Sequence, residues 1–185
     1  DTTWAASGSP YIIKGNIRVM PSKTLTVEPG VTVLIGGNYY IKISGFISAV
    51  GTSGSPIVFS PYDATDDISA KWVGLKIDST STTTLDGNND YVSGSEIKYA
   101  TIRNATTGLY IWNTGFYASN IDFRYNVSAI ELRKTNGVSI KRSDFTNNTY
   151  ATYTEYEVNS GDSYGEIQNS YIDGNTFTKN SYGLY

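Results

Sequence analysis

A short β-type segment recurs along the second half of the chain, and this repeat limits the fold more than any other feature. Each copy centres on an apolar residue between two polar ones, and successive centres are 21, 22 and 32 residues apart. The centres are Ile102, Phe123, Phe145 and Phe177. A second position follows each centre by seven residues and holds Leu109, Ile130, Thr152 and Leu184. An offset that stays constant while the spacing varies indicates a repeated structural unit.

The second position of the repeat extends toward the N-terminus. Gly74–Ile77 resembles Gly108–Ile111 and precedes it by 34 residues, and Tyr40–Ile43 lies a further 34 residues upstream. In each segment, apolar residues alternate with other residues, as they do in half-buried strands. We therefore expect one strand of each repeat to align with the next along most of the chain.

A period near 22, built of short alternating strands, is too short for a propeller blade and lacks the helix of a βα repeat. It predicts an all-β fold: a right-handed, three-sided parallel β-helix, or solenoid, of about seven rungs. We expect a single domain over residues 1–185, with N-terminal entry rungs in 1–38 and repeats in 39–185. Loop insertions are expected near residues 62–70, 79–94 and 155–165.

Composition excludes several classes of function. The chain has 185 residues, no Cys, no His and a formal charge of -3. The missing residue types rule out disulfide scaffolds, Ser-His-Asp and Cys-His catalysis and the usual zinc sites. The slight acidic excess argues against nucleic-acid binding, and no apolar run approaches the ~20 residues of a membrane span.

Three asparagines align at one bend of the predicted coil. Asn126, Asn148 and Asn180 each follow a repeat centre by three residues. Asn tolerates the left-handed backbone of tight bends, and stacked amides bond from one rung to the next, which predicts an inward asparagine ladder. The sequons at Asn104 and Asn147 are then better glycosylation candidates than the sequon at Asn126.

The first part of the chain resembles a known family. It contains the stretches SPY, TLTVEPGV, GFISAVGT, SPIVFS and WVGLKI, in this order, after Trp4. This pattern resembles the opening rungs of exported right-handed parallel β-helix (pectate-lyase-like) repeat proteins of the cell-surface or adhesin type. The resemblance implies an extracellular or cell-surface location. The family includes adhesin-like proteins, S-layer-associated proteins and polysaccharide-degrading enzymes.

Alternation along the predicted strands places one group of residues on an outward face. Aromatic rings and charged groups then lie on neighbouring rungs, as a sugar-binding surface requires. The candidate glycan-binding residues are Lys76, Tyr110, Trp112, Glu131, Arg133 and Tyr153. A purely structural interpretation is also open, because cross-strand aromatic and ion pairs stabilise sheets.

Two classes of function fit this face. The first is a non-enzymatic extracellular module for adhesion or structural assembly that binds glycans. The second is a polysaccharide lyase or glycoside hydrolase, with Glu131 and Glu155, or Lys76 and Arg133, as its catalytic pair. Because the local signatures of pectate lyases and polygalacturonases are missing, we favour the first class and assign no catalytic residue.

One segment matches the start of a calcium loop. Asp86, Asn88 and Asp90 place oxygen ligands at alternate positions within the expected insertion. The bidentate Glu of an EF-hand is missing, because Ile97 occupies its position. The alternative interpretation is a polar turn with no cofactor.

The last five residues, Ser181–Tyr185, lie within a predicted strand and carry no polar cap. Uncovered strand edges pair with other chains. We therefore expect either that the chain is a fragment of a longer rod or that it self-associates through the C-terminal rung, for example into end-to-end filaments.

Overall fold

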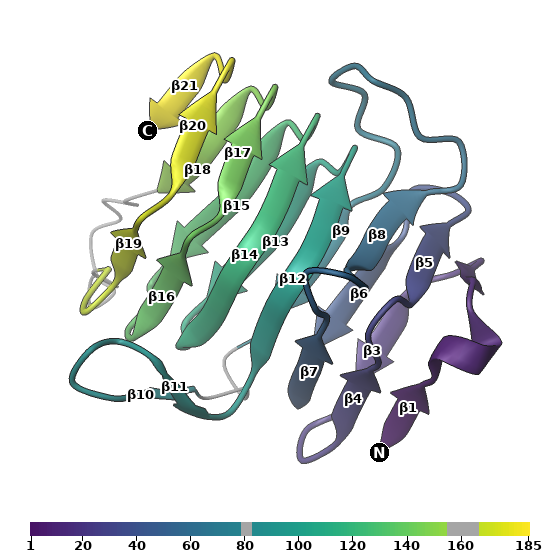
Figure 1. The fold of residues 1–185 in the computed structure, drawn as a ribbon, viewed down its shortest axis with the longest axis horizontal. Coiled ribbons are helices and arrows are strands. Elements are labelled where there is room, and N and C mark those ends of the chain that lie inside the picture. Colours follow the sequence, from purple (N-terminus) through teal and green to yellow (C-terminus); the bar gives the residue numbers. More distant parts are fainter. Residues whose placement is uncertain (79–82, 155–166) are drawn as a thin grey trace, which may run out of the picture.

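The computed structural model describes residues 1–78, 83–154 and 167–185, and these residues form an all-β structure (Figure 1). The described part contains strands of two to nine residues and one 3₁₀ turn, Ala6–Gly8. The strands follow one another along the long axis of the molecule, so that the two termini lie at opposite ends (Figure 1). Within the described residues, no helix has the length and apolar character needed to cross a membrane.

Most strands belong to two sheets of parallel strands. The larger sheet has twelve strands among the described residues: β1 (Thr2–Trp4), β2 (Tyr11–Ile13), β4 (Thr24–Val27), β5 (Thr32–Ile35), β7 (Phe46–Val50), β8 (Ile57–Pro61), β12 (Glu96–Arg103), β14 (Phe116–Arg124), β16 (Val138–Lys141), β17 (Asp144–Thr146), β19 (Tyr171–Asp173) and β20 (Thr176–Thr178). The second has seven: β3 (Ile17–Val19), β6 (Tyr40–Ile43), β9 (Gly74–Ile77), β13 (Thr107–Trp112), β15 (Ser128–Arg133), β18 (Tyr150–Thr154) and β21 (Tyr182–Leu184).

The larger sheet divides into two rows of strands. The first part of β12 pairs with β7, and the part after Tyr99 pairs with β8. Likewise, β14 pairs with β16 before Asn120 and with β17 after it. Tyr99 and Asn120 both have positive φ, which turns the strand at that point. Together with the second sheet, each repeat therefore contributes to three rows of parallel strands.

The register predicted from the repeat is confirmed. Ile102 lies beside Phe123, which lies beside Phe145, and Phe145 lies beside Phe177. In the second sheet, the same pairing joins Leu109, Ile130, Thr152 and Leu184. The upstream match is also confirmed, since Ile41 pairs with Leu75 and Leu75 with Leu109.

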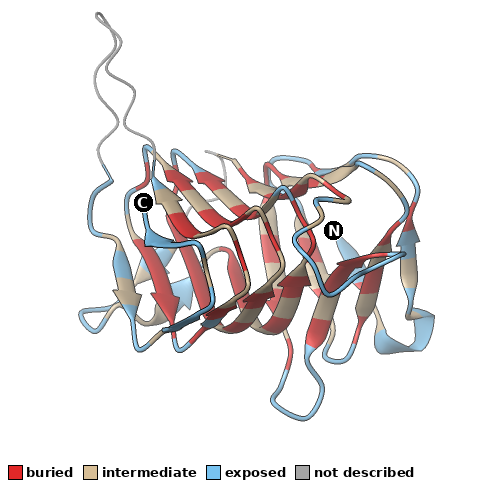
Figure 2. Cartoon of the chain, turned by 90° about the horizontal axis from the view of Figure 1, so that it is seen from above, coloured by how far each residue is buried: buried red, intermediate tan, exposed pale blue. Residues whose placement is uncertain are grey.

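Alternate side chains of the strands point into a shared apolar interior, which Figure 2 shows as buried bands across successive strands. The rings of Phe123, Phe145 and Phe177 stack with centroids 4.9 Å apart. Such stacks add to the gain from burial, which is about 1.5–3 kcal/mol for each large apolar side chain. Thr152 interrupts its apolar column, and its buried hydroxyl has no hydrogen-bond partner among the described residues.

The asparagine ladder is confirmed. Asn126 and Asn148 are completely buried. The Nδ2 of Asn126 donates to Oδ1 of Asn148 over 3.0 Å, and Asn148 bonds Asn180 in the same way. Each amide also accepts from a backbone N–H of the preceding repeat, such as that of Ala105. The ladder thus joins successive repeats at one bend.

The structure describes the first of the three expected insertions completely and the second in part. Residues 62–70 lie between β8 and β9, and Arg103 pairs with Asp66 there. Within 79–94, the chain forms a hairpin of β10 (Thr84–Leu85) and β11 (Tyr91–Ser93), where the sequence predicts only a loop. The third insertion, 155–165, lies outside the described residues, as do residues 79–82 of the second.

Candidate functional site

The outer surface of the second sheet brings all six predicted glycan-binding residues together. Lys76 on β9 lies directly beside Tyr110 on β13, which lies beside Glu131 on β15, and Glu131 beside Tyr153 on β18. Trp112 pairs with Arg133 two positions further along the same strands. We call this group of six residues the β13–β15 face. Strand spacing in a parallel sheet places its neighbouring side chains ~5 Å apart.

Glu131 is held in place on the β13–β15 face. Its Oε1 accepts a hydrogen bond from Nε of Arg133 over 2.7 Å, and its Oε2 accepts one from the hydroxyl of Thr107 over 3.2 Å. The Arg133 guanidinium in turn lies 5.8 Å from the ring centroid of Tyr110. A carboxylate, a guanidinium and an aromatic ring are therefore fixed relative to one another.

The neighbouring strands carry further cation contacts. The Lys76 ammonium lies 5.3 Å from the ring centroid of Tyr40, which is a cation–π distance. Lys42 forms an ion pair of 2.9 Å with Asp78, which also accepts a hydrogen bond from Ser44. These contacts restrict the long side chains, so the surface presents its polar groups in a defined arrangement.

Trp112 provides the exposed apolar surface of the β13–β15 face. It is 39% exposed, whereas Trp4 and Trp72 are 8% and 0% exposed. The exposed indole, two residues after Tyr110 on the same strand, offers stacking surface for the apolar face of a pyranose. Arg133 and Glu131 next to it can bond the hydroxyl groups of such a ring. Few placed polar groups next to aromatic surface are typical of sites for small ligands.

The predicted calcium residues lie in the hairpin, where protein groups contact their oxygens. Oδ1 of Asp86 accepts hydrogen bonds from the backbone N–H groups of Asn88 and Asp90. Lys141 of β16 donates to Oδ1 of Asp90 over 2.9 Å and to the Asn88 carbonyl over 2.7 Å. The hydrogen bond from Lys141 to the Asp90 side chain holds the pKa of that carboxyl below its ordinary value. A lysine ammonium thus lies against two of these oxygens, the Asn88 carbonyl and Oδ1 of Asp90.

No group of three or more His, Cys, Asp or Glu side chains that could hold a metal ion occurs in residues 1–78, 83–154 and 167–185. Calcium binding by Asp86, Asn88 and Asp90 stays a prediction. The contacts with Lys141 instead show how the hairpin docks. It lies on the outer surface of β12, β14 and β16, where Tyr117, Ser139 and Lys141 are buried.

Replacing Lys141 with methionine is expected to release the hairpin from this surface. Methionine keeps much of the volume of the side chain but cannot donate the two hydrogen bonds to Asn88 and Asp90. We expect hydrogen exchange at β10 and β11 to accelerate about tenfold, the equivalent of ~1.4 kcal/mol of lost docking free energy. Exchange mass spectrometry of peptides from residues 83–94 measures this change. Lys14→Met, at an exposed site, is the matched control, and unchanged exchange in Lys141→Met would disprove the docking role.

The two sequons differ in accessibility. Asn104 is completely buried, and its Nδ2 donates to the backbone carbonyl of Asp67 over 2.8 Å. A glycan on that nitrogen would have to displace this bond. Asn147 is half-buried and lies at a bend with positive φ. The geometry therefore favours Asn147 over Asn104 as an acceptor.

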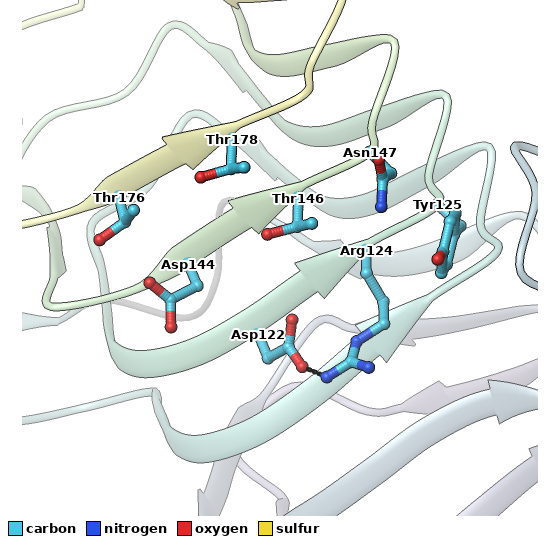
Figure 3. A pocket seen from close by; sticks show the side chains of 8 residues that line it. All are labelled: Asp122, Arg124, Tyr125, Asp144, Thr146, Asn147, Thr176 and Thr178. Carbon is cyan, nitrogen blue, oxygen red and sulfur yellow. Dashed lines mark ion pairs between the residues drawn. The ribbon is translucent and has the colours of Figure 1, made fainter.

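A polar hollow of about 360 Å³ lies outside the larger sheet, and the sequence reasoning did not find it (Figure 3). Its lining residues come from β14, β17, β20 and the bends that follow: Asp122, Arg124, Tyr125, Asp144, Thr146, Asn147, Thr176 and Thr178. Asp122 and Arg124 form an ion pair at one side of it, along strand β14 (Figure 3). The repeat carries a signal for this hollow, because six of these eight positions directly flank the apolar centres Phe123, Phe145 and Phe177.

Comparisons with known proteins give one partial match. No protein-family profile matches the chain, and no solved structure matches it. A stretch of 62 residues is 40% identical to "Protein bark beetle" of Drosophila melanogaster. That stretch is 34% of this chain and 2% of the Drosophila protein. The chain therefore spans a very small part of the length of this relative.

Proposed function

We propose that the chain is a non-enzymatic glycan-binding module, built as a right-handed, three-sided parallel β-helix of the pectate-lyase-like kind. In this proposal it acts outside the cell or at the cell surface, in adhesion or structural assembly. Three rows of parallel strands in one repeat support a three-sided coil, and right-handed coiling is the rule for parallel connections. Self-association through Ser181–Tyr185 stays a prediction.

The observation that carries the proposed binding function is the arrangement around Tyr110. The exposed Trp112 indole follows it on the same strand, and the Arg133 guanidinium lies over its ring. Arg133 is fixed by Glu131, so these groups do not need to be ordered when a ligand binds. Preorganised surfaces lose less entropy on binding, which favours even a shallow site.

The same contacts favour binding over catalysis. A glycosidase needs one carboxyl group that gives up a proton and a second that attacks or activates water. Both oxygens of Glu131 already accept hydrogen bonds from protein donors, which suits a fixed acceptor better than a proton donor. Assaying for new reducing ends or unsaturated products on acidic and neutral polysaccharides tests the enzymatic alternative.

A double substitution of Tyr110→Ala and Trp112→Ala tests the binding function. Loss of two aromatic stacking contacts is expected to weaken glycan binding by about 1–3 kcal/mol, which corresponds to roughly 5- to 150-fold in affinity. A glycan array that compares the double variant with the unmodified protein measures the effect.

Tyr62→Ala is the control for this comparison, because Tyr62 is 66% exposed and lies in the 62–70 insertion, outside the β13–β15 face. It should bind every glycan as the unmodified protein does. Equal binding by the double variant would remove the β13–β15 face from consideration.

A further inference from the structure

Four tyrosine rings form one continuous cluster on β18, on β21 and on Tyr185, the residue that follows β21. Tyr150 lies directly beside Tyr182, and Tyr153 and Tyr185 follow the neighbouring pair Thr152 and Leu184 by one residue each. Tyr150 is in register with Ser128 on β15 and, through Ser128, with Thr107 on β13. The Thr107 hydroxyl bonds the outward side chain of Glu131, so the Tyr150 position also faces outward.

The ring distances within this cluster are short in both directions. Between the strands, Tyr150 stacks on Tyr182 with centroids 5.0 Å apart, and Tyr153 stacks on Tyr185 at 5.6 Å. Along the strands, Tyr150 meets Tyr153 and Tyr182 meets Tyr185 edge to face, both at 5.4 Å. Tyr150 also lies 5.3 Å from Tyr185 with a tilt of 56°. Each ring therefore has at least two ring neighbours.

Exposure makes these rings accessible to an oxidant. Tyr182 and Tyr185 are 48% and 60% exposed. By contrast, the other pair of contacting tyrosines in the described residues, Tyr91 and Tyr117, includes a ring that is 3% exposed, and the Lys98 ammonium lies over both rings. The four-ring cluster thus combines proximity with access, whereas in the other pair the Tyr117 ring is closed off from solvent.

We propose that this tyrosine cluster is a site of oxidative cross-linking that joins β18 covalently to the segment Tyr182–Tyr185. A peroxidase with hydrogen peroxide takes one electron and one proton from each of two phenols. The two radicals couple through the ring carbons next to their hydroxyl groups, and both rings regain aromaticity as those carbons pass their protons to the phenoxyl oxygens. Two tyrosines and one peroxide give one dityrosine and two waters.

The experiment treats the intact protein with a peroxidase and hydrogen peroxide and then digests it with trypsin. Cleavage after Lys179 separates Tyr150 and Tyr153, in the peptide of residues 143–179, from Tyr182 and Tyr185, in the peptide of residues 180–185. A link between the strands therefore appears as these two peptides joined, with the loss of two hydrogen atoms. We expect fragment spectra to place the link on Tyr150 or Tyr153, at a yield that does not change on dilution.

A double variant, Tyr182→Phe and Tyr185→Phe, keeps the stacked rings but removes the phenols, and it should lose the joined peptides. Tyr62→Phe should leave their yield unchanged, and no link should join Tyr91 to Tyr117. Oxidation that consumes tyrosine without joining the two peptides, or that joins them only between separate molecules, would overturn the proposal.

Discussion

Replacing Gly74 with alanine is expected to destabilise the protein by about 3 kcal/mol or more, because the change adds both backbone strain and a clash. Gly74 has φ of +127°, a conformation that residues with a side chain rarely adopt. A Cβ at this position would lie 1.6 Å from the carbonyl oxygen of Thr107, on the adjacent strand β13. Since this strand carries Tyr110 and Trp112, the variant should also disturb the β13–β15 face. Urea unfolding followed by circular dichroism measures the loss.

Gly183→Ala is the matched control for Gly74→Ala. Gly183 lies in β21 of the same sheet, and a Cβ there would meet no atom within 4 Å. We expect its free energy of unfolding to stay within about 0.5 kcal/mol of that of the unmodified protein, as for other surface substitutions. Equal stability of both variants would contradict the close approach of β9 and β13.

Replacing Asn126 with alanine is expected to cost on the order of 3–5 kcal/mol, since each buried polar group left without a partner costs ~1–3 kcal/mol. The substitution leaves the N–H of Ala105 and the carbonyl of Ile102 without the amide that now bonds them at 2.9 and 3.0 Å. It also breaks the bond to Asn148. Water cannot easily replace these contacts, because Asn126 is completely buried.

Comparing Asn180→Ala with Asn126→Ala shows how much of the lost unfolding free energy comes from burial and how much from the missing amide bonds. Asn180 makes the same kinds of bond, to Asn148 and to the carbonyl of Phe145, but it is only half-buried. Solvent can satisfy the groups it leaves behind, so the loss in unfolding free energy should be less than half that of Asn126→Ala. A loss as large as that of Asn126→Ala would show that the ladder does not depend on burial.

Strand register was the feature that the sequence predicted best. Ile102, Phe123, Phe145 and Phe177 could be aligned because each repeat must place one apolar residue at the same depth in a shared interior. The asparagine ladder followed from the same alignment. Alternation then placed Lys76, Tyr110, Glu131 and Tyr153 side by side, as the structure does.

The contacts of the insertions could not be predicted in this way. Lys141 bonds Asp90 across 51 positions of sequence, and no local pattern of the 79–94 segment encodes that contact. Alternate oxygen-bearing residues suggested a cation loop, but whether a metal or a lysine meets such oxygens depends on tertiary packing. The hollow beside Arg124 was not predicted for a different reason. The repeats were aligned on their apolar centres alone, and most residues of the hollow lie on either side of those centres.

The most direct test of the proposed glycan-binding face is a tryptophan fluorescence titration with oligosaccharides of neutral hexoses, N-acetylhexosamines and uronic acids. Trp112 reports on its face because Trp4 and Trp72 are buried. The proposal predicts a saturable change in emission with at least one of these classes. In the variant with Tyr110→Ala and Trp112→Ala it predicts that the change is lost and that the binding measured by calorimetry is weakened. No saturable change with any class, or calorimetric binding that the double variant retains in full, would contradict it.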